Sequence, residues 1–359
     1  MGSDMPLFDA PRRSGGFQPP SQNCADKSPS ESELDSRSTS AAGSSRYEYT
    51  GLLLIGDPHL EGRAPGFRKD DYPEVILHKL SWCLDYAAQQ RLLPALLGDI
   101  FDKPRDNPNW LLVRLLGILR GEIIGLYGNH DCAEPALCDN DSLSVLVKAG
   151  RLRLVSEDDP WRGTIGGRNV VVGGSCWRQP IPERFEADAA NGCEPLVIWL
   201  AHHDVLIPGY DQGRVQPREI PGVDLLVNGH IHRRLQSVQA GGTLWVTPGN
   251  ISRRKRSDAT REHVPAALRV DISAVGYELS DVHVPHQPFE EVFHEMIVDA
   301  PAPTGESAFV SGLAELQARR TAGGVGLMEF LEQNLTQFDA AVAAEIRTLA
   351  MEVTSDVPQ

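Results

Sequence analysis

The sequence predicts an α/β protein in which two packed, mixed β-sheets are flanked by helices, and two observations indicate this fold class. In the first part of the chain, short apolar runs alternate with segments of helical periodicity, which is typical of parallel strands joined by crossover helices. In the middle, short strand-like runs follow one another with turn residues between them. Two packed sheets with outer helices fit this change of pattern better than one doubly wound sheet.

The alternating part begins with an apolar strand that ends at a Gly-Asp turn, because Leu52 to Ile55 is continuously apolar. The helix that follows carries Ile76, Leu80 and Leu84 at helical spacing, so one face is apolar. The last helix of this part is entered through Asp141 as an N-cap. We expect strands and helices in turn at residues 50–55, 73–90, 92–97, 110–120, 122–127 and 141–146.

The middle of the chain predicts strands with few helices between them. We expect these strands at residues 152–155, 169–173, 196–200, 225–227, 243–247, 267–271 and 277–284. No internal repeat of solenoid length is present.

The two ends of the chain differ in composition from the part between them. Residues 1–46 are rich in Ser, Pro and Gly with few aliphatics, so we expect a disordered leader before a domain at 47–285. Residues 286–359 hold a Pro-rich linker and then an amphipathic helix at about 328–353, a C-terminal helical extension. This helix either packs on its own domain or docks a partner, and the sequence does not choose between the two.

The overall charge and the cysteines argue against a basic surface and against a disulfide-bonded protein. A formal net charge of −15 excludes a surface that is basic throughout, although a local basic patch can still bind nucleic acid. Six cysteines without a CxxC pair predict reduced thiols in a cytoplasmic protein. No apolar stretch approaches the ~20 residues of a membrane span, and the start of the chain has no signal-peptide pattern, so no membrane association is expected.

Five short turns, each after an aliphatic run, contain the candidate metal-ligating residues. They are Gly56-Asp57-Pro58-His59, Gly98-Asp99-Ile100-Phe101-Asp102, Gly128-Asn129-His130-Asp131, Ala201-His202-His203-Asp204 and Gly229-His230-Ile231-His232. Because ligands bind beyond the carboxyl ends of strands in α/β sheets, these side chains can converge. Carboxylate, amide and imidazole donors without thiolate suit divalent ions, and two such ions can hold a phosphate and activate water. Asp99 is the natural bridging carboxylate.

These turns resemble the full signature of the calcineurin-like metallophosphoesterases over about residues 47–285. The resemblance implies that family's four-layer fold and two metal sites. The first site would use Asp57, His59, Asp99 and His232, and the second would use Asp99, Asn129, His202 and His230. His203 stays an alternative to His202. His130 would be the general acid or phosphate contact, with Asp102 and Asp131 as partners that set its tautomer and charge.

Within this superfamily the chain is most similar to the SbcD-type DNA nuclease subunits. The similar stretches are Arg68-Lys69-Asp70-Asp71-Tyr72, Gly98-Asp99-Ile100-Phe101-Asp102 and Thr247-Pro248-Gly249-Asn250. A basic strip beside the last motif favours contacts to a phosphate backbone, with a solvated loop as the alternative. The strip consists of Arg233, Arg234, Arg253, Arg254, Lys255 and Arg256. Two features depart from the SbcD pattern: the His202-His203 turn, and the short stretch after Pro285, which leaves a DNA-capping domain reduced or missing.

The sequence therefore predicts a Mn²⁺-dependent DNA nuclease that works with an SbcC-like ATPase through its C-terminal helix. Mg²⁺, Zn²⁺ and Fe²⁺ are alternative ions, and a homodimer is implied by the resemblance alone. One alternative is a phosphoesterase that acts on small nucleotides or phosphoproteins, and it would not need the basic strip. Another is a non-catalytic scaffold of the same fold.

Overall fold

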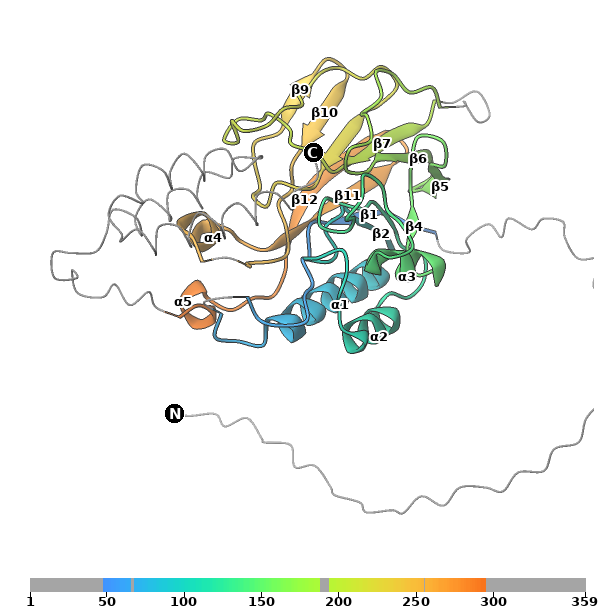
Figure 1. Ribbon diagram of the computed structural model, residues 1–359. Helices are drawn as coiled ribbons and strands as arrows, with labels where there is room; N and C mark the ends of the chain where they lie inside the picture. The colour runs from blue at the N-terminus through green and yellow to red at the C-terminus, as the bar shows by residue number, and fades with distance from the viewer. Residues whose placement is uncertain (1–47, 66–67, 188–193, 255, 295–359) are drawn as a thin grey trace, which may run out of the picture. The chain divides into compact units, whose positions relative to one another are not determined.

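The computed structural model describes residues 48–65, 68–187, 194–254 and 256–294, whose strands form two six-stranded sheets (Figure 1). The first sheet has the order β12-β11-β1-β2-β3-β4, and the second has the order β5-β6-β7-β8-β10-β9. Both sheets are mixed, because each adds antiparallel strands to a parallel centre. The predicted fold class is thus confirmed.

The parallel strands of the first sheet end together, and this alignment positions the site. Its strands are β1 (Gly51–Ile55), β2 (Leu92–Leu96), β3 (Ile124–Gly125), β4 (Arg153–Leu154), β11 (Ala266–Ser273) and β12 (Gly276–His283). Ile55 of β1 lies opposite Leu96 of β2, which in turn lies opposite Gly125 of β3. The turns that follow these three strands therefore leave the sheet at one edge.

The second sheet brings the two histidine-rich turns to a common edge in the same way. Its strands are β5 (Trp161–Ile165), β6 (Arg168–Ser175), β7 (Leu196–Ala201), β8 (Leu225–Asn228), β9 (Val238–Ala240) and β10 (Thr243–Val246). Ala201 at the end of β7 lies opposite Asn228 at the end of β8. His202 and His230, which follow these residues closely, are therefore neighbours.

Alternate residues of the second sheet enter two different cores. On β7, Ile198 and Leu200 pack in the large core that also holds Leu53 of β1, so the two sheets lie face to face. Trp199 belongs to a separate core with Phe185, on the opposite face of the second sheet. Both faces of the central strands are buried, which explains their continuously apolar sequences.

The three longest helices pack beside the first sheet, where α1 contacts β1 and β2 (Figure 1). The helices are α1 (Tyr72–Gln90), α2 (Asn109–Ile118), α3 (Ser142–Lys148), α4 (Asp258–Glu262) and α5 (Phe289–Val292). Helix α1 begins after Asp71, whose side chain accepts a hydrogen bond from the Glu74 amide, and it buries Ile76 and Leu80. No helix of the described residues is long and apolar enough to cross a membrane.

Each strand and helix expected within residues 47–285 is present, with bounds shifted by a few residues. The sequence prediction missed β5, β9, α4 and α5. The expected leader at 1–46 and the expected helix at 328–353 lie outside the described residues. Four cysteines are unbridged in the described part of the chain: Cys83, Cys132, Cys138 and Cys176.

Candidate metal centre

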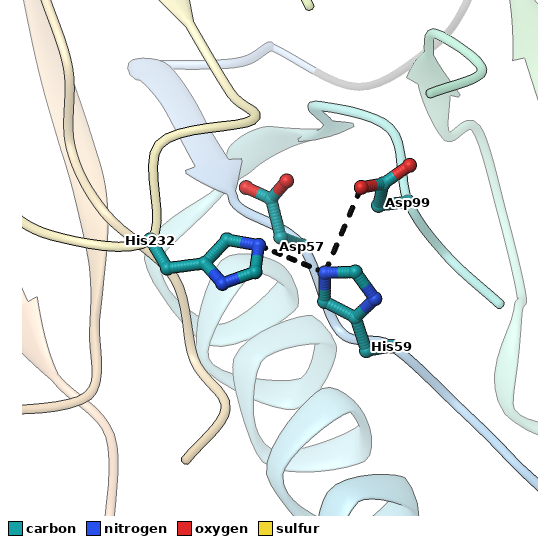
Figure 2. Close-up of side chains that lie close together, drawn as sticks. All are labelled: Asp57, His59, Asp99 and His232. Carbon is teal, nitrogen blue, oxygen red and sulfur yellow. Dashed lines mark hydrogen bonds and ion pairs between the residues drawn. The ribbon is translucent and has the colours of Figure 1, made fainter. Parts of the chain in front are cut away.

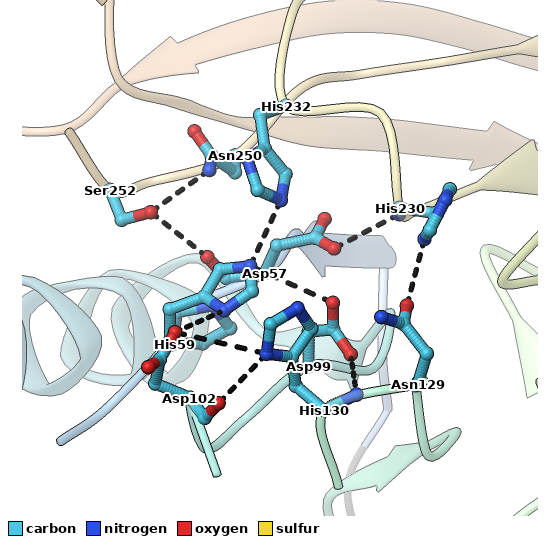
Figure 3. Close-up of polar contacts among 12 residues, drawn as sticks. Asp57, His59, Asp99, Asp102, Asn129, His130, His230, His232, Asn250 and Ser252 are labelled. Atoms are coloured by element: carbon cyan, nitrogen blue, oxygen red, sulfur yellow. Dashed lines mark hydrogen bonds and ion pairs between the residues drawn. The ribbon is translucent and has the colours of Figure 1, made fainter. Parts of the chain in front are cut away.

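The five ligand-rich turns meet at one edge of the two sheets, and their side chains form two main clusters and a third one made of His59, Asp102 and His130. Figure 3 labels all the residues of these clusters except His202. In each cluster, one possible ligand atom per residue lies within 4.8 Å of the others. Asp57, His59, Asp99, Asp102 and His202 are buried although their side chains are polar or charged, whereas His232 is exposed. A buried set of this kind is unfavourable unless its charges are compensated.

The first cluster contains Asp57, His59, Asp99 and His232 (Figure 2). The Nε2 atoms of His59 and His232 are 2.9 Å apart, and His59 Nε2 is 3.6 Å from Asp99 Oδ2. The structure thus brings together all four residues predicted for the first metal.

The second cluster contains Asp99, His202 and His230, with the Asn129 amide between the two rings. His202 Nε2 lies 3.4 Å from Asp99 Oδ2 and 3.2 Å from Asn129 Oδ1, and His230 Nδ1 lies 2.9 Å from the same amide oxygen. Asp99 belongs to both clusters, so its carboxylate occupies the place that a bridging ligand needs.

Of the two adjacent histidines, His202 faces the cluster and His203 does not. His202 Nδ1 is 2.7 Å from the Leu97 carbonyl oxygen, which orients Nε2 toward Asp99. The His203 ring instead lies nearly parallel to Trp177, with centroids 6.3 Å apart, and its buried Nε2 has no hydrogen-bond partner. This geometry favours His202 as the ligand.

The backbone at the ligands is strained. Asp57, His59, Asp99 and His230 all have positive φ, with values of 39°, 49°, 48° and 68°. Non-glycine residues adopt such angles infrequently, and clusters of them occur at functional sites. Gly128 supplies the space for this packing, because a Cβ atom there would lie 2.1 Å from Asp99 Oδ1.

The electrostatics of the clusters fit divalent cations. Burial raises the pKa of Asp57 to about 8, and its buried Oδ2 has no hydrogen-bond partner. Burial lowers the pKa of His202, but the Asp99 and Asp57 carboxylates together outweigh this effect and raise the pKa to about 9. Burial also lowers the pKa values of His59 and His232, which favours their neutral forms. The unpaired Asp57 oxygen beside the neutral imidazoles of His59 and His232 is a donor set suited to a hard-to-borderline divalent ion.

His130 is placed to act on a substrate rather than to hold an ion in either main cluster. Its side chain is 31% exposed, whereas the predicted ligands Asp57, His59, Asp99 and His202 are buried. Its Nδ1 lies 2.7 Å from the Asp102 carbonyl oxygen, so Nδ1–H donates and Nε2 remains for a substrate. The Asp102 carboxylate is shared, with Oδ1 3.5 Å from His59 Nδ1 and 3.8 Å from His130 Nδ1.

The predicted role of Asp131 as a partner of His130 is wrong. Its fully buried carboxylate accepts hydrogen bonds from the amides of Ile100, Phe101 and Gly128, at 2.9–3.2 Å. Asp131 therefore ties two of the ligand-bearing turns together through their backbones. Aspartate suits this position because each carboxylate oxygen can accept more than one bond.

The predicted DNA-binding strip is divided by the structure. Arg253 is buried and donates to the carbonyl oxygens of His263 and Gln287, so its guanidinium is already bonded within the protein. Arg234 pairs with Asp281, and Arg256 donates to the His294 carbonyl oxygen. Arg233, Arg253 and Arg254 line the cavity over the metal centre. Lys255 lies outside the described residues.

The sequence analysis missed three residues at the centre. Asp204 holds His230, with Oδ1 2.8 Å from the ring Nε2, so the other ring nitrogen faces Asn129. Trp177 stacks on His230, with ring centroids 5.1 Å apart. Glu61 pairs with Arg254. Asp204 lies within a quoted motif and could have been found there, whereas a lone Trp or Glu carries no comparable signal.

A cavity of about 540 Å³ opens over the clusters. Its lining includes His130 and five of the possible ligands: His59, Asp99, Asn129, His230 and His232. The cavity is large enough for a small phosphodiester.

The sequence profile of the calcineurin-like phosphoesterases matches residues 51–234, just over half of the chain. The chain belongs to the calcineurin-like phosphoesterase family. All seven predicted metal ligands and His130 lie within the matched residues. Family membership and the ligand clusters together identify metal-dependent phosphoester hydrolysis as the activity class of this calcineurin-like site.

Two solved structures show low similarity to this calcineurin-like chain. A conserved uncharacterized protein from Streptococcus pneumoniae, described as a predicted phosphoesterase, is 12% identical with a TM-score of 0.31; the match covers 67% of this chain and 93% of that protein. Vps29 from Chaetomium thermophilum is 13% identical with a TM-score of 0.29, over 67% of this chain and all of Vps29. Similarity at this level indicates no substrate or partner. No curated protein matches the sequence significantly.

Proposed function

We propose that this chain is a two-metal phosphodiesterase that cleaves DNA with Mn²⁺, in the manner of the SbcD-type nucleases. The observation that carries the proposal is the sharing of Asp99 by two ligand clusters beside the exposed ring of His130. Bound divalent ions would supply charge for the phosphate and lower the pKa of water. Asp57, His59 and His232 would hold one ion, and His202, His230 and Asn129 the other, with Asp99 common to both.

The role that we propose for His130 is proton transfer to the leaving oxygen of the phosphodiester. Its Nδ1–H is fixed by the Asp102 carbonyl oxygen, so Nε2 is the atom that can carry the proton into the cavity. Its side chain is 31% exposed and lines the cavity, so the ring can reach a bound phosphate.

The His130→Ala variant tests this role. We expect a loss of turnover of ~10²–10⁴-fold on DNA, which is the usual contribution of general acid catalysis. The melting temperature and the Mn²⁺ content should stay at those of the parent, because His130 belongs to neither main cluster. DNA cleavage at the parental rate would show that another group protonates the leaving oxygen.

DNA is the favoured substrate because Arg233, an exposed cation, lines the cavity beside the metal clusters; Arg254 lines it too, but pairs with Asp102 and Glu61. We also keep three residues of the basic strip as proposed contacts to the phosphate backbone: Arg234, Lys255 and Arg256. A different observation favours the alternative substrates, which are small nucleotides or phosphoproteins. Arg234, Arg254 and Arg256 already bond to carboxylates or carbonyl oxygens, and a small substrate would not need them.

One assay separates the two substrate classes. The purified protein is incubated with Mn²⁺ and single-stranded DNA, duplex DNA or bis(p-nitrophenyl) phosphate. We expect cleavage of DNA and of the ester. Turnover of the ester alone would favour a small substrate, and absence of bound metal with no turnover would indicate a non-catalytic scaffold.

The partners follow from the same proposal. An SbcC-like ATPase would bind through the helix expected at 328–353, and the chain would form a homodimer in the cytoplasm. Copurification of a coiled-coil ATPase with the full chain, and its loss when residues 328–359 are deleted, tests the docking role. Retention of the ATPase by the truncated chain would assign docking to another surface.

A further inference from the structure

Arg254 lies between two carboxylates at the edge of the metal centre. Its Nη2 is 2.7 Å from Asp102 Oδ2, and its Nε is 3.1 Å from Glu61 Oε1. The Arg254 side chain is 24% exposed, that of Glu61 12% and that of Asp102 5%, so the three groups interact with little solvent. They come from three segments that are distant in sequence: the turns after β1 and β2, and the loop after β10.

The second oxygen of Asp102 faces the metal centre. Its Oδ1 lies 3.5 Å from His59 Nδ1 and 3.8 Å from His130 Nδ1 (Figure 3). His59 points its other nitrogen, Nε2, into the first ligand cluster. A histidine that binds a metal commonly donates its remaining N–H to a carboxylate, and this bond fixes the ring orientation. Asp102 is therefore in the place from which His59 can be oriented.

We propose that Arg254 is a positioning residue for the metal centre, because it holds Asp102 in the orientation that directs the His59 ring. The inference rests on the proposed two-metal function. Arginine suits this role because its planar fork fixes two oxygens at once, with Glu61 on Nε and Asp102 on Nη2. A lysine would keep the charge and lose this geometry.

The charges around Arg254 favour the positioning role over a direct contact to DNA. Glu61 and Asp102 together offset its positive charge, so the group is not a free cation of the basic strip. Without the guanidinium, the half-buried Glu61 carboxylate and the buried Asp102 carboxylate would be left without their shared cation, and Asp102 could turn away from His59. Loss of Arg254 should therefore weaken metal binding, an effect that loss of a contact to the DNA backbone would not have.

The test compares Mn²⁺ affinity in the parent, Arg254→Met and Arg254→Lys, measured by calorimetry on the full chain at one fixed pH. We expect Arg254→Met to weaken one of two Mn²⁺ sites by ~10–100-fold, the usual effect of removing a group that orients a ligand. The value of kcat for bis(p-nitrophenyl) phosphate should fall with it, although this small ester has no extended backbone to contact. Arg254→Lys should lie between the parent and the methionine variant.

Arg114→Met is the matched control. Arg114 also forms an arginine–glutamate pair between two elements, with Nη1 and Nη2 at 2.8 and 2.9 Å from the Glu74 carboxylate, but this pair joins α1 and α2 away from the centre. Its Mn²⁺ affinity and kcat should equal those of the parent.

The possible results are distinct. Parental Mn²⁺ affinity with a raised KM for DNA alone would make Arg254 a DNA contact and overturn the positioning role. If Arg254→Met does not fold, the Mn²⁺ affinity of Arg254→Lys serves as the test. A lysine variant with parental Mn²⁺ affinity would show that the two bonds of the guanidinium are not needed. A parent that cleaves the ester and not DNA would contradict the nuclease proposal and leave the Mn²⁺ comparison valid.

Discussion

Gly128→Ala perturbs the centre by adding one methyl group where the structure has no room. A Cβ atom at Gly128 would lie 2.1 Å from Asp99 Oδ1 and 2.5 Å from the Asp99 backbone nitrogen. The second contact is to backbone, so a side-chain rotation alone cannot relieve the overlap. Since carbon and oxygen atoms rest at roughly 3.5 Å, the carboxylate must move by more than ~1 Å.

The size of the effect follows from this overlap. Forcing an extra methyl group into a packed site destabilises a protein by about 1–3 kcal/mol. For a domain of this size that corresponds to a fall in melting temperature of about 2–12 °C. The displacement also affects metal binding, because Asp99 belongs to both ligand clusters and its Oδ1 accepts a hydrogen bond from the His130 amide. We therefore expect weaker binding at both Mn²⁺ sites.

The assay is a melting curve with and without Mn²⁺, together with Mn²⁺ titration. Gly117→Ala is the control, because a Cβ atom at this helical glycine meets nothing within 4 Å. That change should raise stability by about 0.5–1 kcal/mol, the usual gain of alanine over glycine in a helix. If Gly128→Ala melts like the parent and binds two Mn²⁺ ions equally tightly, the close approach of Asp99 to Gly128 is refuted.

Two further predictions concern Lys79 and the histidine doublet. Burial lowers the pKa of Lys79 to about 7, so between this pH and ~10.4 the unfolded chain binds more protons and stability rises with pH. Lys79→Met should raise the free energy of unfolding by roughly 2–4 kcal/mol at pH 6, a value that already includes the loss of the hydrogen bond to the Ile251 carbonyl oxygen. Near pH 10 the gain should be small. Urea melts that give an equal gain at both pH values would contradict this prediction. His202→Ala should lose the second Mn²⁺ ion, whereas His203→Ala should keep both, and metal analysis giving the reverse result would exchange their roles.

The strands that carry the ligands were predictable because each is a buried apolar run closed by a polar turn. The elements that were not predicted lack such an apolar run followed by a polar turn. In β5, Arg162 and Gly163 interrupt the apolar residues, and β9 is only three residues long. Helices α4 and α5 have five and four residues, too few to show helical periodicity. Their positions depend on tertiary contacts, such as the hydrogen bond from the Lys69 amide to the Val292 carbonyl oxygen near α5.

The ligand residues were predictable from their types and from their places at strand ends, whereas side-chain directions were not. Asp102 and Asp131 stand in similar turns, yet one carboxylate faces two imidazoles and the other faces backbone amides. Arg253 and Arg254 are adjacent, yet the first donates to backbone carbonyl oxygens and the second pairs with two carboxylates. Only the folded arrangement of distant segments decides which neighbour each group meets.

We expect one edge of the two sheets to hold two divalent ions that share Asp99. Anomalous scattering at the manganese edge would locate Mn²⁺ in crystals of the protein. Two peaks ~3.5–4 Å apart are predicted, one against Asp57, His59 and His232 and the other against His202 and His230. A single peak, or two peaks without Asp99 between them, would contradict the account.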